Sequence, residues 1–245
     1  MKLAILSDIH SNLEALVAVI KDMKNQGVNS AYCLGDVIGY GPFPKTCLSI
    51  VRRICKIILK GNHEDCICDQ TDLEEKLNDY ALEGIRFSIR LLSKKEVNFI
   101  KTFSMTKVIK ELDLSLSHGS FSDPEKWQYI ETPEDAEAEL KLIPTRLCMV
   151  GHTHIPYVFG NKKGLYDDLP DNLLLDKTEK FLINVGSVGQ PRDEDCRASY
   201  GILEYKKGEV RFDLRRVAYE ISKTARAMKK SGLPKCLYQR LFVGR

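Results

Sequence analysis

Apolar and polar positions follow two different periods along the first sixty residues. Short apolar runs, which predict buried strands, lie at 3–6, 31–34 and 55–59. Helical spacing follows the first run, with a capping box of Ser11 and Glu14 at its start and Gly27 at its end. A second helix is expected after Pro44. Alternating strands and helices are typical of βαβ units, so we expect a parallel or mixed sheet covered by helices.

The middle of the chain has a mostly helical pattern from 70 to 103, where Ser93 and Glu96 form another capping box. We interpret about 65–105 as a helical insertion over the sheet. Apolar and β-branched positions then return and predict strands at 107–116, 147–150, 157–159 and 181–185. These strands deliver polar residues at their C-terminal ends, where ligands of open α/β sheets bind.

The C-terminal part combines a hairpin with a basic helix. Two strands at 200–205 and 209–214 flank a Lys-Lys-Gly turn, and a helix at 218–230 ends before Gly232 and Pro234. From Lys206 onward the chain has twelve basic residues and three acidic ones, although its net charge is only +3. This basic tail suggests an element that attracts phosphate or polyanions, including nucleic acid. A solvated, lysine-rich helix face explains the charge equally well.

The composition is that of an ordinary globular protein, with 43% hydrophobic and 29% charged residues among 245. No apolar run reaches the roughly eighteen residues of a membrane span, and the apolar stretch after Met1 is too short for a signal peptide. We therefore expect a cytoplasmic protein without a membrane partner. Its eight cysteines should stay reduced, most of them as small buried residues. The oligomeric state is left open.

Every histidine of the chain follows a predicted strand, beside an Asp, Asn or Gly; the five are His10, His63, His118, His152 and His154. A single histidine in such a place is most often a hydrogen-bonded structural residue. Five of them, with Asp8, Asp36 and Asn62 at equivalent strand ends, indicate a metal site instead, because such sites gather ligands from several strands.

The mixture of ligand types indicates first-row transition metals. Imidazole suits manganese, iron, zinc and nickel, whereas carboxylate and amide oxygens favour harder ions. Seven candidate ligands are too many for one four-coordinate ion. They fit two divalent or trivalent ions about 3.5–4 Å apart that share one carboxylate, the arrangement used for in-line phosphoryl displacement. Asp36 is our candidate for the shared carboxylate.

Taken together, the motifs resemble those of the calcineurin-like metallophosphoesterases, in order and in spacing. They are Asp8-Ile9-His10, Gly35-Asp36, Gly61-Asn62-His63-Glu64, His118 and Gly151-His152-Thr153-His154. The segment 186–192 is similar to one in the small bacterial and archaeal phosphodiesterase branch, so the resemblance reaches about residue 193. It implies a four-layer α/β/β/α sandwich with two mixed sheets. We expect this domain at 1–215 and the basic helix and tail at 216–245.

The resemblance also implies a division of the ligands. One ion would be held by Asp8, His10, Asp36 and His154, and the other by Asp36, Asn62, His118 and His152. His63 would stand outside the metal shell, where an imidazole can protonate the leaving oxygen or stabilise charge on the phosphoryl group. In the expected mechanism a hydroxide that bridges the two ions attacks phosphorus, without a covalent enzyme intermediate.

Three further residues are candidates for binding the substrate phosphate. Asn12 lies in the first turn of the first predicted helix, where backbone N–H groups favour an anion, although an ordinary first-turn role explains it as well. Arg192 could contact phosphate or form exposed ion pairs with Asp193 and Glu194. Tyr40 could line the substrate cleft or merely pack a glycine turn.

The Gly-Asp motif departs from that of the phosphoprotein phosphatases of the family. Where those continue to an Asp-Arg pair, Gly39 and Tyr40 stand here. This argues against a protein serine/threonine phosphatase and against the symmetrical dinucleoside tetraphosphatase of that branch.

We therefore expect a metal-dependent phosphohydrolase for a small phosphodiester or nucleotide. The alternatives are a dinucleoside polyphosphate hydrolase, a nuclease that uses the basic tail, and a non-catalytic scaffold of the same fold.

Overall fold

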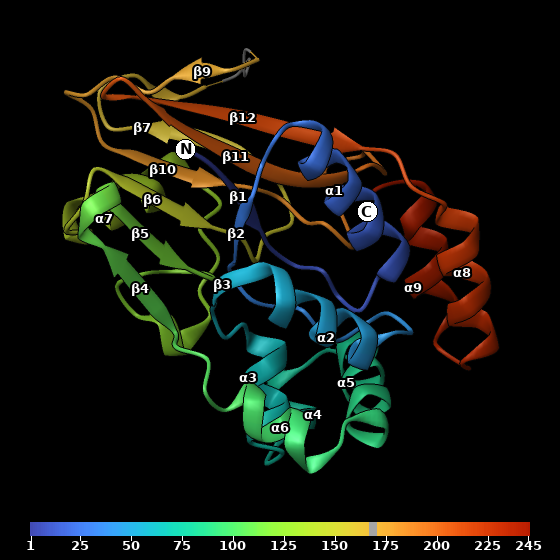
Figure 1. Ribbon diagram of the computed structural model, residues 1–245. Coiled ribbons are helices and arrows are strands. Elements are labelled where there is room, and N and C mark those ends of the chain that lie inside the picture. The colour runs from blue at the N-terminus through green and yellow to red at the C-terminus, as the bar shows by residue number, and fades with distance from the viewer. Residues whose placement is uncertain (167–170) are drawn as a thin grey trace.

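Two mixed six-stranded sheets form the centre of the computed structural model, which describes residues 1–166 and 171–245 (Figure 1). In spatial order, the first sheet contains β3 (Cys55–Ile58), β2 (Ser30–Cys33), β1 (Lys2–Leu6), β11 (Ala198–Lys206), β12 (Glu209–Val217) and β9 (Leu173–Leu174). The second contains β4 (Thr106–Ile109), β5 (Leu114–Ser117), β6 (Leu147–Val150), β10 (Phe181–Asn184), β7 (Tyr157–Gly160) and β8 (Gly164–Leu165). Strands β1, β2 and β3 are parallel, and so are β5, β6 and β10.

The two sheets pack face to face, as the alternating directions of side chains along their strands show. On β1, Leu3 and Ile5 pack into a core between the sheets, and Ala4 points to the opposite face. On β10, Phe181 contributes to the core between the sheets, whereas Leu182 packs on the outer side. Each sheet thus has two apolar faces, which must both be covered. The expected four-layer α/β/β/α sandwich is confirmed.

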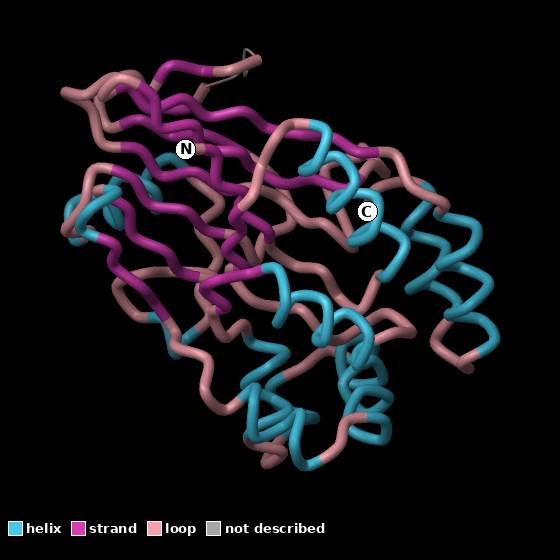
Figure 2. Tube along the Cα trace, viewed as in Figure 1, coloured by secondary structure: helices cyan, strands magenta, loops and turns pink. Residues whose placement is uncertain are grey.

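Helices cover both outer faces, outside the layered strands that Figure 2 shows in magenta. Helices α1 (Leu13–Asn25) and α2 (Pro44–Ile54) contribute to the core on the outer face of the first sheet. Helix α7 (Pro133–Leu142) covers the second sheet through Ala136 and Leu140. None of the described helices combines the length and the apolar content that crossing a membrane requires.

The helical part between β3 and β4 consists of α3 (Asn62–Cys68), α4 (Leu73–Lys76), α5 (Asp79–Leu91) and α6 (Lys94–Ile100). It forms the lower group of helices in Figure 1 and packs against the end of the α2 layer. The predicted capping box of Ser93 and Glu96 is present at the start of α6. Short 3-10 turns lie at 110–112, 124–126 and 240–242.

Two local predictions were wrong. The N-cap of α1 is Asn12, not Ser11, because Ser11 takes a left-handed backbone conformation with φ 56° and its hydroxyl does not bond the helix start. The single strand expected at 107–116 is instead the pair β4 and β5, separated by a 3-10 turn that ends at Asp113 with φ 50°. No Gly or Pro signals this turn, since an aspartate tolerates the left-handed conformation.

The C-terminal segment packs on the body of the protein. Helix α8 (Ile221–Lys230) contacts α1, where the buried Thr224 hydroxyl donates to Asn12 Oδ1 over 3.0 Å. Helix α9 (Lys235–Gln239) adds Leu237 to an apolar cluster that contains Tyr40. The hairpin of β11 and β12 turns at Lys207 and Gly208, as the sequence predicted. All eight cysteines lie in the described residues, and their thiols are free.

Candidate metal centre

The C-terminal ends of the parallel strands of both sheets meet at one place, and the polar residues that follow them converge there. Asp8 and His10 follow β1, Asp36 follows β2, and Asn62 and His63 follow β3. His118 follows β5 of the second sheet, and His152 and His154 follow β6. The structure therefore brings together side chains that are up to 146 positions apart, as their places at strand ends predicted.

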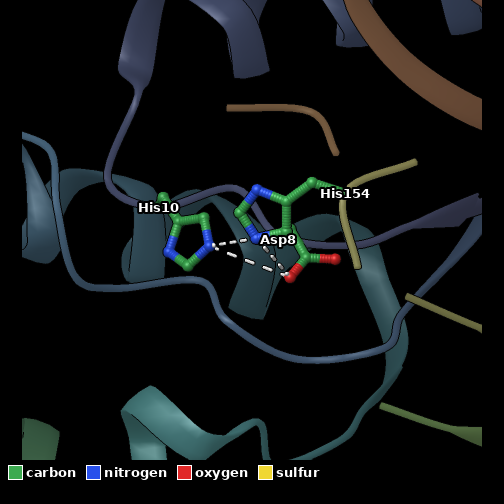
Figure 3. Close-up of side chains that lie close together, drawn as sticks. All are labelled: Asp8, His10 and His154. Carbon is green, nitrogen blue, oxygen red and sulfur yellow. Dashed lines mark hydrogen bonds and ion pairs between the residues drawn. The ribbon is translucent and has the colours of Figure 1, made fainter. Parts of the chain in front are cut away.

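The first cluster contains Asp8, His10 and His154 (Figure 3). The Nε2 atoms of the two histidines are only 3.0 Å apart, and Asp8 Oδ1 is 3.2 Å from Nε2 of His154. The Nδ1 atom of each ring faces a backbone carbonyl. For His10 it is the carbonyl of Ile38, and for His154 it is the carbonyl of Gln190. A carbonyl only accepts hydrogen bonds, so Nδ1 carries the proton of the neutral ring. Two Nε2 lone pairs consequently face each other beside a carboxylate.

The second cluster repeats this arrangement with Asp36, His118 and His152. His118 Nε2 lies 3.1 Å from His152 Nδ1 and 3.4 Å from Asp36 Oδ2. The other ring nitrogens face the carbonyls of Leu34 and Trp127, at 3.2 and 2.8 Å. In the neutral rings these carbonyls again fix the tautomers, so that the remaining lone pairs point at each other.

Asp36 lies between the two clusters. Its Oδ2 is 3.4 Å from Nε2 of His118 and 3.7 Å from Nε2 of His10, so one oxygen faces both sets of imidazoles. Its Oδ1 accepts from the backbone N–H of His63 over 3.0 Å, which orients the carboxylate. This is the geometry that a bridging carboxylate needs.

The donor set fits two cations. Facing lone pairs repel unless something positive lies between them, and Asp8 Oδ1 and Asn62 Oδ1 are buried without a hydrogen-bond partner in the described part of the chain. Burial opposes ionisation of Asp8 and Asp36, yet the surrounding imidazoles hold the pKa of both carboxyl groups below the usual range. Burial also opposes protonation of His118, but Asp36 and Asp8 raise its pKa to about 9. The carboxylates thus create a field that favours positive charge.

The backbone is strained where these side chains are attached. Five of the residues in the two clusters have left-handed backbone conformations: Asp8 (φ 53°), His10 (48°), Asp36 (51°), His152 (67°) and His154 (63°). For non-glycine residues such conformations are uncommon and cost free energy, and they concentrate at functional sites. The surrounding fold therefore holds these loops in shapes that aim their side chains at one point.

Glu64 provides part of this support, a role that its place in the motif 61–64 did not predict. It is fully buried, and its carboxylate accepts hydrogen bonds of 2.7 to 3.2 Å from the backbone N–H groups of Asp36, Val37, Ile38 and Gly61. Burial and the nearby Asp36 carboxylate raise the pKa of Glu64 to about 7, and the N–H groups act in the opposite direction. Glu64 therefore ties the loop after β2 to the loop after β3.

His63 lies next to the two clusters. Its ring centroid is 4.8 Å from that of His10, and its Nε2 is 3.9 Å from Asp36 Oδ2. Nδ1 is buried with no hydrogen-bond partner among the described residues, because Gly39 lies against it. A Cβ at position 39, where φ is +90°, would stand 1.9 Å from this atom. The glycine in place of a carboxylate thus allows the close approach of His63.

The three candidate phosphate-binding residues occupy different environments. Tyr40 is buried, with its ring 4.7 Å from those of both His10 and His63. Arg192 is half-buried, and its Nη2 donates to Gln190 Oε1 over 2.9 Å.

The alternative roles of these candidates can also be compared with the structure. Arg192 forms no ion pair in the described residues: Asp193 pairs with Arg216 and Glu194 with Arg245. The expected ion pairs of Arg192 with Asp193 and Glu194 are therefore absent from the described residues. The Asn12 amide is fully engaged within the fold, since it caps α1 through Ala15 and donates to Gly189 O and to Tyr219.

Tyr129 and Trp127 were not found from the sequence. Tyr129 stacks on His152 with ring centroids 4.2 Å apart and an interplanar angle of 9°. The carbonyl of Trp127 is the partner of His152 Nε2, so this loop orients one of the candidate ligands. The loop is anchored by the buried Glu139, which accepts from the backbone of Phe121 and from the Ser120 hydroxyl. No motif or periodicity marks these positions.

The calcineurin-like phosphoesterase superfamily domain matches residues 1–208, which covers every residue of the two clusters. The chain belongs to this family. The match extends beyond the residue at which the motif resemblance ended, because it includes the strand β11. A phosphoesterase assignment agrees with the convergence of ligands at the strand ends, and it makes a metal-dependent hydrolase of phosphoester bonds the expected class.

Two relatives match this phosphoesterase over nearly its whole length. An uncharacterized protein of Methanocaldococcus jannaschii is 35% identical over 245 residues, which cover 99% of this chain and 98% of that protein. The crystal structure of a metallophosphoesterase from Sphaerobacter thermophilus superposes with a TM-score of 0.86 at 32% identity and covers 100% of both chains.

A hypothetical protein from Pyrococcus horikoshii is similar in fold. Its TM-score is 0.78 at 16% identity, and the match covers 100% of this chain and 98% of that one. The C-terminal helices therefore lie within the matched length of these proteins.

We predict that Glu64→Gln weakens metal binding about 10- to 100-fold, because one acceptor oxygen becomes an amide that faces backbone N–H groups. Elemental analysis after dialysis against a metal buffer measures this change. The matched control is Glu96→Gln, which alters a glutamate that also accepts a backbone N–H, but at the start of α6. Equal metal content in both variants would contradict the role given to Glu64.

Proposed function

We propose that this phosphoesterase cleaves phosphoester bonds at a centre of two first-row transition metal ions. Asp8, His10 and His154 would hold one ion, His118, His152 and Asn62 the other, and Asp36 would bridge them. The observation that carries this proposal is the pair of facing imidazole lone pairs, with Asp36 Oδ2 within reach of both. Nitrogen and oxygen donors in this mixture suit manganese, iron, zinc or nickel.

When bound, two such ions lower the pKa of a water molecule and neutralise charge on phosphate oxygens. The remaining chemistry falls to protein side chains. His63 has no carboxylate on Nδ1, and its Nε2 side faces Asp36, so it can donate a proton to the leaving oxygen or stabilise the phosphoryl group. Its burial excludes bulk water from this proton.

Arg192 and Tyr40 are the proposed phosphate contacts. The Arg192 guanidinium carbon is 5.9 Å from the centre of the Tyr40 ring, and that ring is in contact distance of two site histidines. An arginine without a carboxylate partner keeps donors available for a phosphate. The Asn12 amide is not a proposed contact, because it makes its hydrogen bonds with the backbone of Gly189 and Ala15.

Hydrolysis of bis-p-nitrophenyl phosphate tests the proposal. Activity should require added manganese or a similar ion, stop with a chelator, and be abolished in Asp36→Asn, which lacks the bridging charge. The matched control is Asp72→Asn, an exposed aspartate with a similar left-handed backbone, φ 53° against 51°. Full activity of Asp36→Asn would refute the bridging role of Asp36. Full activity of the chelated protein would refute the requirement for metal ions.

A second prediction concerns His63. His63→Asn should lower kcat by about 10²- to 10⁴-fold, the usual contribution of a general acid, and leave the metal content unchanged because His63 is not a proposed ligand. Steady-state kinetics and elemental analysis on the same preparation measure both quantities. Loss of metal together with activity would make His63 a ligand, and an unchanged kcat would remove it from the mechanism.

A further inference from the structure

Glu139 is a buried carboxylate that the proposed reaction does not use. It lies on the face of helix α7 that packs Ala136 and Leu140 on the second sheet, and only 7% of it is exposed. Burying a charge is costly unless hydrogen bonds replace the lost water. In the described chain all the hydrogen bonds of this carboxylate come from residues 120–122, and none comes from a Lys, Arg or His side chain.

These hydrogen bonds tie the loop 119–130, which lies between β5 and α7, to the helix. The backbone N–H groups of Phe121 and Ser122 donate to Glu139 Oε2 over 2.9 and 3.1 Å. The hydroxyl of Ser120 donates to Oε1 over 2.9 Å, and the Ser122 hydroxyl donates to the same oxygen. Both oxygens are thus satisfied, and one carboxylate fixes three consecutive residues of the loop.

The start of the loop is joined to its end. The backbone N–H of Ser120 donates to the carbonyl of Gln128 over 3.3 Å. Gly119 leaves room for this contact, since a Cβ at that position would stand only 2.9 Å from the same carbonyl oxygen. The neighbouring Trp127 has a left-handed backbone with φ 53°, a conformation that its surroundings must hold. The anchored start of the loop therefore supports the backbone at its end.

The Trp127 carbonyl is the part of the loop that reaches the metal centre. It lies 2.8 Å from Nε2 of His152, which leaves Nδ1 of the neutral ring free to bind an ion. The carbonyls that face the other three imidazoles belong to Leu34, Ile38 and Gln190, all of which are buried. Trp127, in contrast, is flanked by exposed residues on both sides. One candidate ligand thus depends on a surface loop for its orientation.

We propose that Glu139 is a positioning residue of the metal centre, because it holds the loop 119–130 and thereby orients His152. The ion in the half formed with His118 depends on Glu139, and the ion in the other half does not. This inference rests on the proposed two-metal function. Loss of the outer partner of a metal-binding histidine commonly lowers metal affinity about 10- to 100-fold, because the ring is no longer preorganised.

Manganese binding by Glu139→Gln tests this inference. The amide turns N–H donors toward the N–H and O–H groups of the loop, so the loop loses its anchor. Calorimetric titration of the metal-free protein gives the two affinities, and anomalous diffraction assigns them to the two halves. We expect the affinity at His10 and His154 to stay that of the wild type, and the affinity at His118 and His152 to fall about 10- to 100-fold.

Glu137→Gln is the matched control, because Glu137 is an exposed glutamate of the same helix that pairs with Lys141 over 3.0 Å. Both of its affinities should equal those of the wild type. Unchanged affinities in Glu139→Gln would overturn the inference, and so would equal weakening of both ions, which would show a general structural effect. Ser120→Ala removes a single donor and should weaken the same ion to a smaller extent. It decides the question if Glu139→Gln does not fold.

The loop can also be followed without metal, because Trp127 is the one tryptophan of the chain. Quenching of its fluorescence by acrylamide in the metal-free protein should increase in Glu139→Gln and not in Glu137→Gln. Equal quenching in both variants would overturn the anchoring role. A wild type that binds fewer than two manganese ions would reject the proposed two-metal function and the selective loss with it, and the quenching would still show whether Glu139 holds the loop.

Discussion

The site depends on four imidazole lone pairs that face one another in two pairs. When the rings are neutral, backbone carbonyls fix which nitrogen of each ring carries the proton, so the opposing nitrogens present lone pairs to each other at 3.0 and 3.1 Å. Such an arrangement is unfavourable by itself and becomes favourable when a cation lies between the rings. Asp8 and Asp36 supply the negative charge, and burial keeps water from screening it.

The fold holds these groups in place at a cost in local conformation. Asp8, His10 and Asp36 have left-handed backbones, which are tolerated because the loops are tied down on every side. Glu64 fixes two of the loops through backbone N–H groups, and Trp127 fixes the ring of His152. The same rigidity preorganises the donors, so little reorganisation is needed when a metal or a phosphate binds.

The sequence predicts the parts of the fold that follow simple periods. The apolar runs of β1 and β6 were visible because each strand is buried on both faces. The division of 107–116 into two strands was hidden, since its turn uses Asp113 in place of Gly. Likewise, the residue types Ser11 and Glu14 matched a capping box. In the structure, however, Ser11 has a left-handed backbone, and its N–H donates to the carbonyl of Val37.

For the site, motif spacing indicated the residues of both clusters because each follows a strand that the pattern already predicted. Tyr129 could not be found this way. It reaches the centre through a loop whose position depends on tertiary packing, and it has no local signature. Asn12 shows the opposite case, in which a polar residue near the site serves the scaffold.

The most direct test of this account is a crystal structure of the manganese-loaded protein with anomalous scattering data. Two anomalous peaks are expected on either side of the Asp36 carboxylate, about 3.5–4 Å apart. One peak should contact Nε2 of His10 and His154, and the other Nε2 of His118 and Nδ1 of His152. A single ion, or none, in protein that hydrolyses a phosphoester would contradict the two-metal centre.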